Sequence, residues 1–157
     1  MTIAITGHRP DKLGNEYDMR GPISRKIYQE LDKIVTQINP TRIISGMALG
    51  VDMIFANLAI NKKIPFTAAI PFIGQESKWP EQSQKTYNKI LSLACEKKIV
   101  SPGGYSSAKM QIRNKWMVDN CDILIAVWDG TEGGTYNCLN YAVDRDKDII
   151  RVNPKNL

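Results

Sequence analysis

Short runs rich in apolar residues alternate with amphipathic segments along this chain of 157 residues, and this alternation restricts the fold more than any other feature. The apolar runs cover residues 3–6, 42–45, 65–70, 97–100, 123–127 and 149–152. Apolar side chains recur at helical spacing between them, in segments 22–38, 49–61, 81–94, 107–118 and 136–144. Most of the runs are continuously apolar, which indicates strands that are buried on both faces. We therefore predict an α/β fold, a single three-layer domain over 1–157 with a mostly parallel sheet and helices on both faces.

The predicted sheet itself indicates where a ligand would bind. Right-handed crossovers bring the C-terminal ends of parallel strands to one edge of the sheet. Doubly wound sheets bind their ligands at that edge, where the strand order reverses. The predicted edge gathers Gly7–Arg9, Ser45–Gly46, Pro71–Phe72, Ser101–Gly103 and Asp129–Gly130.

Two glycine-rich turns lie at this edge. The turn from Asp129 to Thr135 follows a strand and opens a helix, so its backbone N–H groups favour an anion such as phosphate. Thr135 is either an N-cap or a phosphate ligand, and we favour the ligand. The turn from Ser45 to Asp52 has the same arrangement but matches neither a P-loop nor the G-x-G-x-x-G fingerprint. Together the two turns indicate a nucleotide-like ligand.

In the second turn, Gly50 and Asp52 can each have a structural role or a role in ligand binding. Gly50 either relieves crowding between strand and helix or admits a ligand. Asp52 lies in a first helical turn, where the helix dipole alone stabilises an acid. Alternatively, Asp52 binds a ribose hydroxyl or orients a reacting group.

Several charged and aromatic side chains are candidates for the same site. Arg9 has a guanidinium suited to bidentate phosphate contact. Lys109 and Arg113 are four residues apart, so they share a helix face that is either an anion site or simply solvated. Trp79 either packs its loop or stacks on a base. A hydrolase of glycosidic bonds would need an acid, and Asp52 and Glu76 are the candidates.

Composition restricts the kinds of catalytic site, cellular location and partner that this chain can have. A single histidine, His8, excludes a catalytic triad or a multi-histidine metal site, and we expect it to be a satisfied loop residue. Three cysteines without histidine partners indicate free thiols in a reducing compartment, the cytoplasm. No apolar run approaches the roughly 20 residues of a membrane span, and a strand at residues 3–6 leaves no room for a signal or transit peptide. The net charge of +5 indicates a solvated basic surface or an anionic partner.

Strings spread over nearly the whole chain resemble the SLOG superfamily, which joins DprA/Smf DNA-processing proteins with LOG phosphoribohydrolases, and within it the YpsA-like group. The matching strings are Thr6–Pro10, Ser45–Asp52, Pro71–Phe72 with Gln75 and Trp79–Pro80, Lys109–Met110, Arg113–Asn114, Met117–Asn120, Ala126–Gly130 and Gly133–Thr135. Singly these strings are unspecific, but together and in this order they are specific.

The resemblance implies a Rossmann-like fold that binds a nucleotide or a nucleotide-derived ligand of the ADP-ribose type. It places ligand contacts at Gly7, Arg9, Gly46, Gly50, Asp52, Trp79, Lys109, Arg113, Gly133, Gly134 and Thr135, and Asp129 of the first turn completes the predicted set. No cofactor is evident, Mg²⁺ is expected only together with a phosphate ligand, and relatives of this architecture commonly pair through helices as homo-oligomers.

One departure from the family pattern bears on activity. The LOG enzymes follow a Pro-Gly-Gly-x-Gly-Thr turn with a catalytic glutamate, whereas here no acid follows Thr135 until Asp144. The first hypothesis is therefore a nucleotide-binding sensor or sequestering module. The second is a nucleotide N-glycosidic hydrolase in which Asp52 or Glu76 supplies the missing carboxylate. The third is a single-stranded DNA-binding protein, which the absence of a basic run disfavours.

Overall fold

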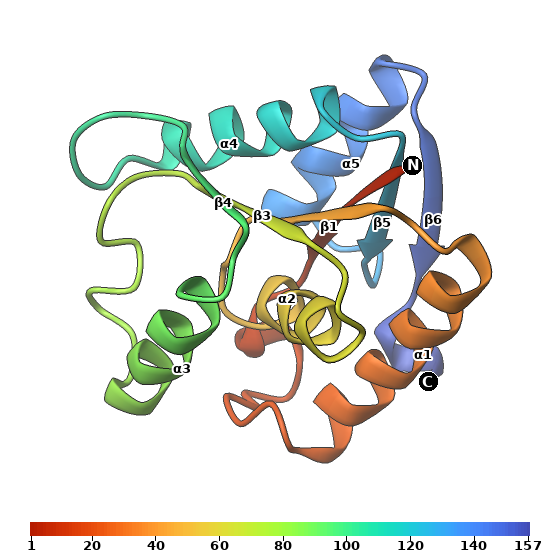
Figure 1. Cartoon of the computed structure of the whole chain (residues 1–157), viewed down its shortest axis with the longest axis horizontal. Helices are drawn as coiled ribbons and strands as arrows, with labels where there is room; N and C mark the ends of the chain where they lie inside the picture. The colour runs from red at the N-terminus through yellow and green to blue at the C-terminus, as the bar shows by residue number, and fades with distance from the viewer.

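The computed structural model describes residues 1–157 and places six strands in one sheet of order β4-β3-β2-β1-β5-β6 (Figure 1). The strands are β1 (Thr2–Gly7), β2 (Arg42–Ser45), β3 (Phe66–Ile70), β4 (Glu96–Ile99), β5 (Ile123–Val127) and β6 (Asp148–Val152). Every neighbouring pair is parallel, which confirms the predicted α/β fold and makes the sheet wholly rather than mostly parallel. The chain builds outward from β1 to β4 and then returns to place β5 beside β1, so the order reverses between these two strands.

Five α-helices cover the two faces of the sheet. They are α1 (Pro22–Ile38), α2 (Val51–Asn61), α3 (Glu81–Leu91), α4 (Ser107–Asp119) and α5 (Gly134–Asp144), with short 3-10 turns η1 (Pro10–Lys12) and η2 (Pro154–Asn156). Figure 1 shows α1, α2 and α3 on one face and α4 and α5 on the other. Successive strand residues point to opposite faces, so Ile3 and Ile5 pack with the first group while Ala4 packs with the second.

The predicted boundaries differ from the observed ones where glycine turns meet helices. Helix α2 begins at Val51 rather than at residue 49, because Gly50 has φ 89°, outside the helical region. Helix α5 begins at Gly134 rather than at residue 136, so the last two residues of the glycine turn are already helical. Helix α3 ends at Leu91 and not near residue 94.

The edge strand β4 differs from the buried strands in that all four of its residues are exposed. Its charged residues Glu96, Lys97 and Lys98 disfavour pairing with a further strand at this open edge. None of the helices combines the length and the apolar content needed to cross a bilayer. Cys121 and Cys138 are buried thiols, whereas Cys95 is exposed.

Candidate ligand site at the switch point

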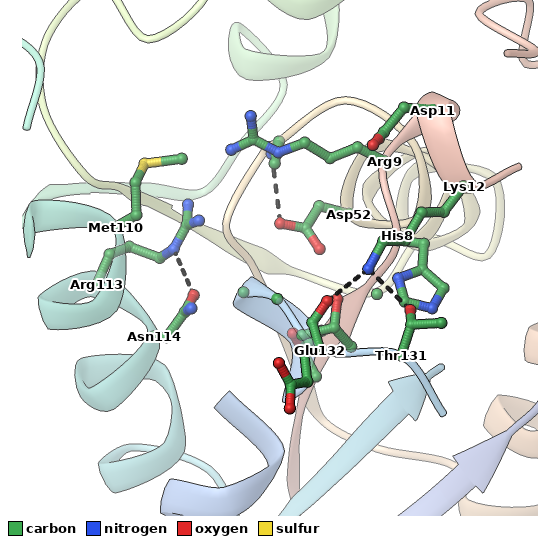
Figure 2. A pocket seen from close by; sticks show the side chains of 16 residues that line it. His8, Arg9, Asp11, Lys12, Asp52, Met110, Arg113, Asn114, Thr131 and Glu132 are labelled. Atoms are coloured by element: carbon green, nitrogen blue, oxygen red, sulfur yellow. Dashed lines mark hydrogen bonds between the residues drawn. The ribbon is translucent and has the colours of Figure 1, made fainter. Parts of the chain in front are cut away.

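A cavity of about 350 Å³ lies where the sheet order reverses, at the carboxyl ends of β1 and β5 (Figure 2). Its lining comes from four segments that are distant in the sequence, within residues 6–12, 48–52, 110–114 and 131–135. Only two of its sixteen lining residues are hydrophobic, so the cavity is suited to a polar ligand. Of the predicted site residues, those that line it are Gly7, Arg9, Asp52, Arg113, Gly133, Gly134 and Thr135.

Glycines allow the end of β1 to lie against the start of α2. A side-chain carbon at Gly7 would fall 2.5 Å from Cβ of Val51, and one at Gly50 would fall 2.5 Å from the carbonyl oxygen of His8. The N–H of Val51 donates to that same carbonyl at 3.3 Å. Both glycines therefore serve backbone packing, although Gly7 also lines the cavity whereas Gly50 does not.

Two buried side chains of opposite charge form the cavity floor. Asp52, from the first turn of α2, accepts the N–H of Ala48 at 3.3 Å through Oδ2. Arg113, from α4, donates through Nη1 to the carbonyl of Gly46 at 2.6 Å and through Nε to Oδ1 of Asn114 at 3.0 Å. Burial raises the pKa of Asp52 and lowers that of Arg113, and the opposite charge of each partner counteracts the shift.

The first turn of α5 presents free backbone donors to the cavity. Gly133 is the N-cap residue with φ 145°, so Thr135 is the second residue of the helix and is not the N-cap. The first hydrogen bond of α5 runs from the N–H of Asn137 to the carbonyl of Gly133. The N–H groups of Gly134, Thr135 and Tyr136 have no acceptor in the protein, and such groups at a helix start attract anions.

The loop before α5 is fastened to the loop after β1. Lys12 donates through Nζ to Oγ1 of Thr131 at 2.8 Å and to the carbonyl of Glu132 at 2.7 Å. Asp129 accepts the N–H and the hydroxyl of Thr131, and chiefly these bonds hold the pKa of its carboxyl well below the usual range. The two loops are thereby held in a fixed relation around the cavity.

His8 also links the loop after β1 to Asp129, and it does so through a single ring nitrogen. Nε2 lies 2.8 Å from Oδ1 of Asp129 and 2.9 Å from the backbone nitrogen of Asp129, which donates to it. The carboxylate contact requires a proton on Nε2, whereas the N–H contact requires a lone pair there, so one protonation state satisfies only one of them. Burial lowers the pKa of His8, which favours the neutral ring, and in that ring the position of the single proton decides which of the two contacts Nε2 makes.

Other predicted residues lie outside the cavity lining. Trp79 packs edge-to-face on Tyr87 of α3, with ring centroids 5.2 Å apart. Lys109 donates through Nζ to the carbonyls of Pro102 and Gly104, so it does not form one patch with Arg113. Glu76, Gly46 and Asp129 are likewise absent from the lining.

Sequence reasoning missed several residues that do line the cavity. Met110 and Asn114 belong to the α4 face that carries Arg113, so their three- and four-residue spacing was the available signal. Lys12 and Thr131 had no such signal, because their meeting depends on how two remote loops fold together. No group of three or more histidine, cysteine, aspartate or glutamate side chains is arranged to hold a metal ion.

Comparison with protein families adds an independent observation to this geometry. The model of the YspA SLOG family, YpsA, matches residues 3–155. This chain belongs to the YpsA family of SLOG proteins. It is 35% identical over 144 residues to the SPbeta prophage-derived protein YoqJ of Bacillus subtilis, covering 79% of this chain and 84% of YoqJ. It is 28% identical over 142 residues to a UPF0398 protein of Bacillus cereus, covering 85% of this chain and 77% of that protein.

Solved structures share the fold of this YpsA family member. DNA processing protein A (DprA) of Streptococcus pneumoniae superposes with a TM-score of 0.67 at 18% identity, over 96% of this chain and 49% of DprA. The chain thus spans about half of that protein. DNA processing protein A of Helicobacter pylori, whose structure was described for its single-stranded DNA binding mode, superposes with a TM-score of 0.65 at 21% identity, over 99% of this chain and 70% of that one.

Proposed function

We propose that this protein binds a nucleotide or a nucleotide-derived ligand of the ADP-ribose type and acts as a sensor or sequestering module. One observation carries the proposal: the cavity at the switch point combines free helix N–H groups with a buried guanidinium and a buried carboxylate. Its volume of about 350 Å³ lies within the range of small-molecule sites. Membership of the SLOG superfamily supports the same ligand class.

The parts of the cavity suit the parts of a nucleotide. Phosphate oxygens would accept the free N–H groups of Gly134 and Thr135, where the helix dipole also favours negative charge. Lys12 and the exposed Arg9 supply positive charge in the same lining. A Mg²⁺ ion enters this proposal only as a companion of the phosphate groups. The polar remainder of the ligand would then face Asp52 and Arg113.

A second candidate function, N-glycosidic hydrolysis of a nucleotide, has one observation in its favour. Asp52 lines the cavity, and burial raises the pKa of its carboxyl, which suits a general acid. Glu76 does not line the cavity, so it would need to move to act on the same ligand. The net charge of +5 and the likeness to DprA leave single-stranded DNA as the third candidate, whose binding would weaken steeply with added salt.

The deciding experiment is mass spectrometry after incubation with ADP-ribose, cyclic ADP-ribose, NAD and nucleoside monophosphates, with the bound fraction and the free solution analysed separately. We expect an intact nucleotide on the protein. Free base in solution, lost in Asp52→Asn, would make the protein a hydrolase instead. Retention of none of these compounds would contradict nucleotide binding altogether.

A matched pair of variants locates the binding. Arg113→Gln should lower retention strongly, because it removes the buried cation of the cavity. Lys115→Gln removes a cation from the exposed side of the same helix, where Lys115 lies over the Tyr141 ring, and should leave retention unchanged. Equal retention in both variants would place the ligand elsewhere.

A further inference from the structure

Two buried charges of opposite sign face the cavity without touching each other. Asp52 is 5% exposed and Arg113 is 4% exposed, yet no nitrogen of Arg113 lies within 4.0 Å of a carboxylate oxygen of Asp52. Figure 2 shows the two side chains reaching toward the cavity from opposite walls, α2 and α4. Gly46 lies between them: a side-chain carbon there would fall 2.5 Å from Nη1 of Arg113 and 2.8 Å from Oδ2 of Asp52.

Each of these groups keeps an unused polar atom. Asp52 uses Oδ2 for the N–H of Ala48 but makes no hydrogen bond through Oδ1. Arg113 uses Nε and Nη1 but makes no hydrogen bond through Nη2. Neither atom is sealed in the interior, where Oε1 of Gln75 is the one buried side-chain oxygen or nitrogen without a hydrogen bond. Oδ1 of Asp52 and Nη2 of Arg113 are therefore open to a group that arrives with the ligand.

The chemistry of that group follows from the two signs. A phosphate would be repelled by Asp52 and an ammonium by Arg113, so the group is uncharged. It must donate one hydrogen bond to a carboxylate and accept another from a guanidinium. A hydroxyl does both, and of two adjacent hydroxyls one can donate to Oδ1 of Asp52 while the other accepts from Nη2 of Arg113.

We propose that Asp52 and Arg113 form the subsite for the 2′,3′-diol of a ribose, with Asp52 as the residue that distinguishes ribose from deoxyribose. This inference rests on the proposed nucleotide-binding function and adds an orientation to it. The sugar lies on the cavity floor against α2 and α4, and the phosphate lies at the start of α5. A phosphate carried on the 2′-hydroxyl itself is excluded, because it would bring its charge against the buried carboxylate.

The test compares AMP, 2′-deoxy-AMP and adenosine 2′,5′-bisphosphate by isothermal titration calorimetry. The wild-type protein should bind AMP at least tenfold more tightly than 2′-deoxy-AMP, since the loss of the hydroxyl leaves Asp52 unpaired, and should bind the bisphosphate more weakly still. In Asp52→Asn the preference for AMP over 2′-deoxy-AMP should fall to within about twofold. Asp144→Asn, which removes an exposed carboxylate at the far end of α5, should retain the wild-type preference.

The ratio of affinities separates recognition from a merely structural role of Asp52. A structural role would weaken all three ligands together and leave their ratios unchanged, which would overturn the assignment. If Asp52→Asn does not fold, the wild-type ratio still decides whether the site reads the 2′-hydroxyl. Equal binding of AMP and 2′-deoxy-AMP by the wild type would refute the diol subsite while leaving nucleotide binding intact. Retention of ADP-ribose without binding of any of the three probes would also refute it, and binding of no nucleotide at all would refute both proposals.

Discussion

Gly46→Ala provides a direct test of how the cavity floor is built. The new Cβ would lie 2.5 Å from Nη1 and 2.7 Å from Cζ of Arg113, and 2.8 Å from Oδ2 of Asp52. Non-bonded carbon atoms favour separations of about 3.5–4.0 Å, so at least one of the charged groups must move by the order of 1 Å. Arg113 cannot move freely, because it donates to Gly46 and Asn114 and is 4% exposed. Asp52 is restrained too, because it is 5% exposed and accepts the N–H of Ala48.

The expected cost has two parts. Overpacking of a buried site costs about 1–3 kcal/mol. Weakening the charged hydrogen bond from Arg113 to the carbonyl of Gly46 adds roughly 1.5–3 kcal/mol when it is lost entirely. Partial relaxation makes the sum an upper bound, so we expect a loss of about 2–4 kcal/mol in the free energy of unfolding. For a chain of this size that corresponds to a fall in Tm of roughly 4–16 °C.

Circular dichroism during thermal and urea unfolding measures this loss. Gly104→Ala is the matched control, since a side-chain carbon there meets no atom within 4 Å and should change stability by less than about 0.5 kcal/mol. If the guanidinium is the obstacle, Gly46→Ala should cost less in an Arg113→Ala background than in the wild type. A stable Gly46→Ala protein, or a cost unaffected by the removal of Arg113, would refute this description of the floor.

Three further outcomes are expected. Burial lowers the pKa of His8 below its unfolded value of 6.5, so the unfolded chain binds more protons and the free energy of unfolding falls as the pH drops from 7 to 5. Because His8 is the only histidine, His8→Gln should flatten this part of a series of urea-unfolding measurements at different pH. An unchanged slope would contradict the lowered pKa. Lys12→Met removes both bonds to the loop at residues 131–132, so hydrogen exchange there should accelerate while Tm changes by only a few degrees; unchanged exchange would show that the fastening does not order the loop. Trp79→Ala should lower stability by about 1–3 kcal/mol through lost packing on Tyr87 and leave nucleotide affinity unchanged; a selective loss of affinity would restore the base-stacking role.

The spacing of apolar residues made the strands and helices predictable from the sequence. The parallel order of the strands then made it predictable that the ligand site lies at their carboxyl ends. The strands are buried between helices, so their apolar runs carry the signal, and the crossover rule brings Gly7, Asp52 and Thr135 together without any contact being known. Even the exposed strand β4 was found within one residue of its observed position.

The sequence did not predict which groups each side chain contacts. Spacing alone placed Lys109 beside Arg113 on α4. Lys109 instead donates to nearby loop carbonyls, whereas Arg113 is buried at the cavity floor and donates to the carbonyl of Gly46. Lys12 joins a loop that is 119 residues away in the sequence, and no local pattern encodes that distance. For Trp79 the sequence left loop packing and base stacking open, and only the structure shows that its ring packs on Tyr87 of α3.

The pairing of β1 with β5 also has a consequence for the order of folding. Ile3 pairs with Ile123, so the two strands that frame the cavity meet only after most of the chain has been synthesised. The first four strands, β1 to β4, form a partial sheet in which β1 is an open edge until β5 pairs with it. Pairings this remote in sequence slow folding, because a long loop must close before its contacts stabilise the chain. The cavity therefore forms only once β1 and β5 have paired, and binding of a ligand there reports that this long-range pairing is complete.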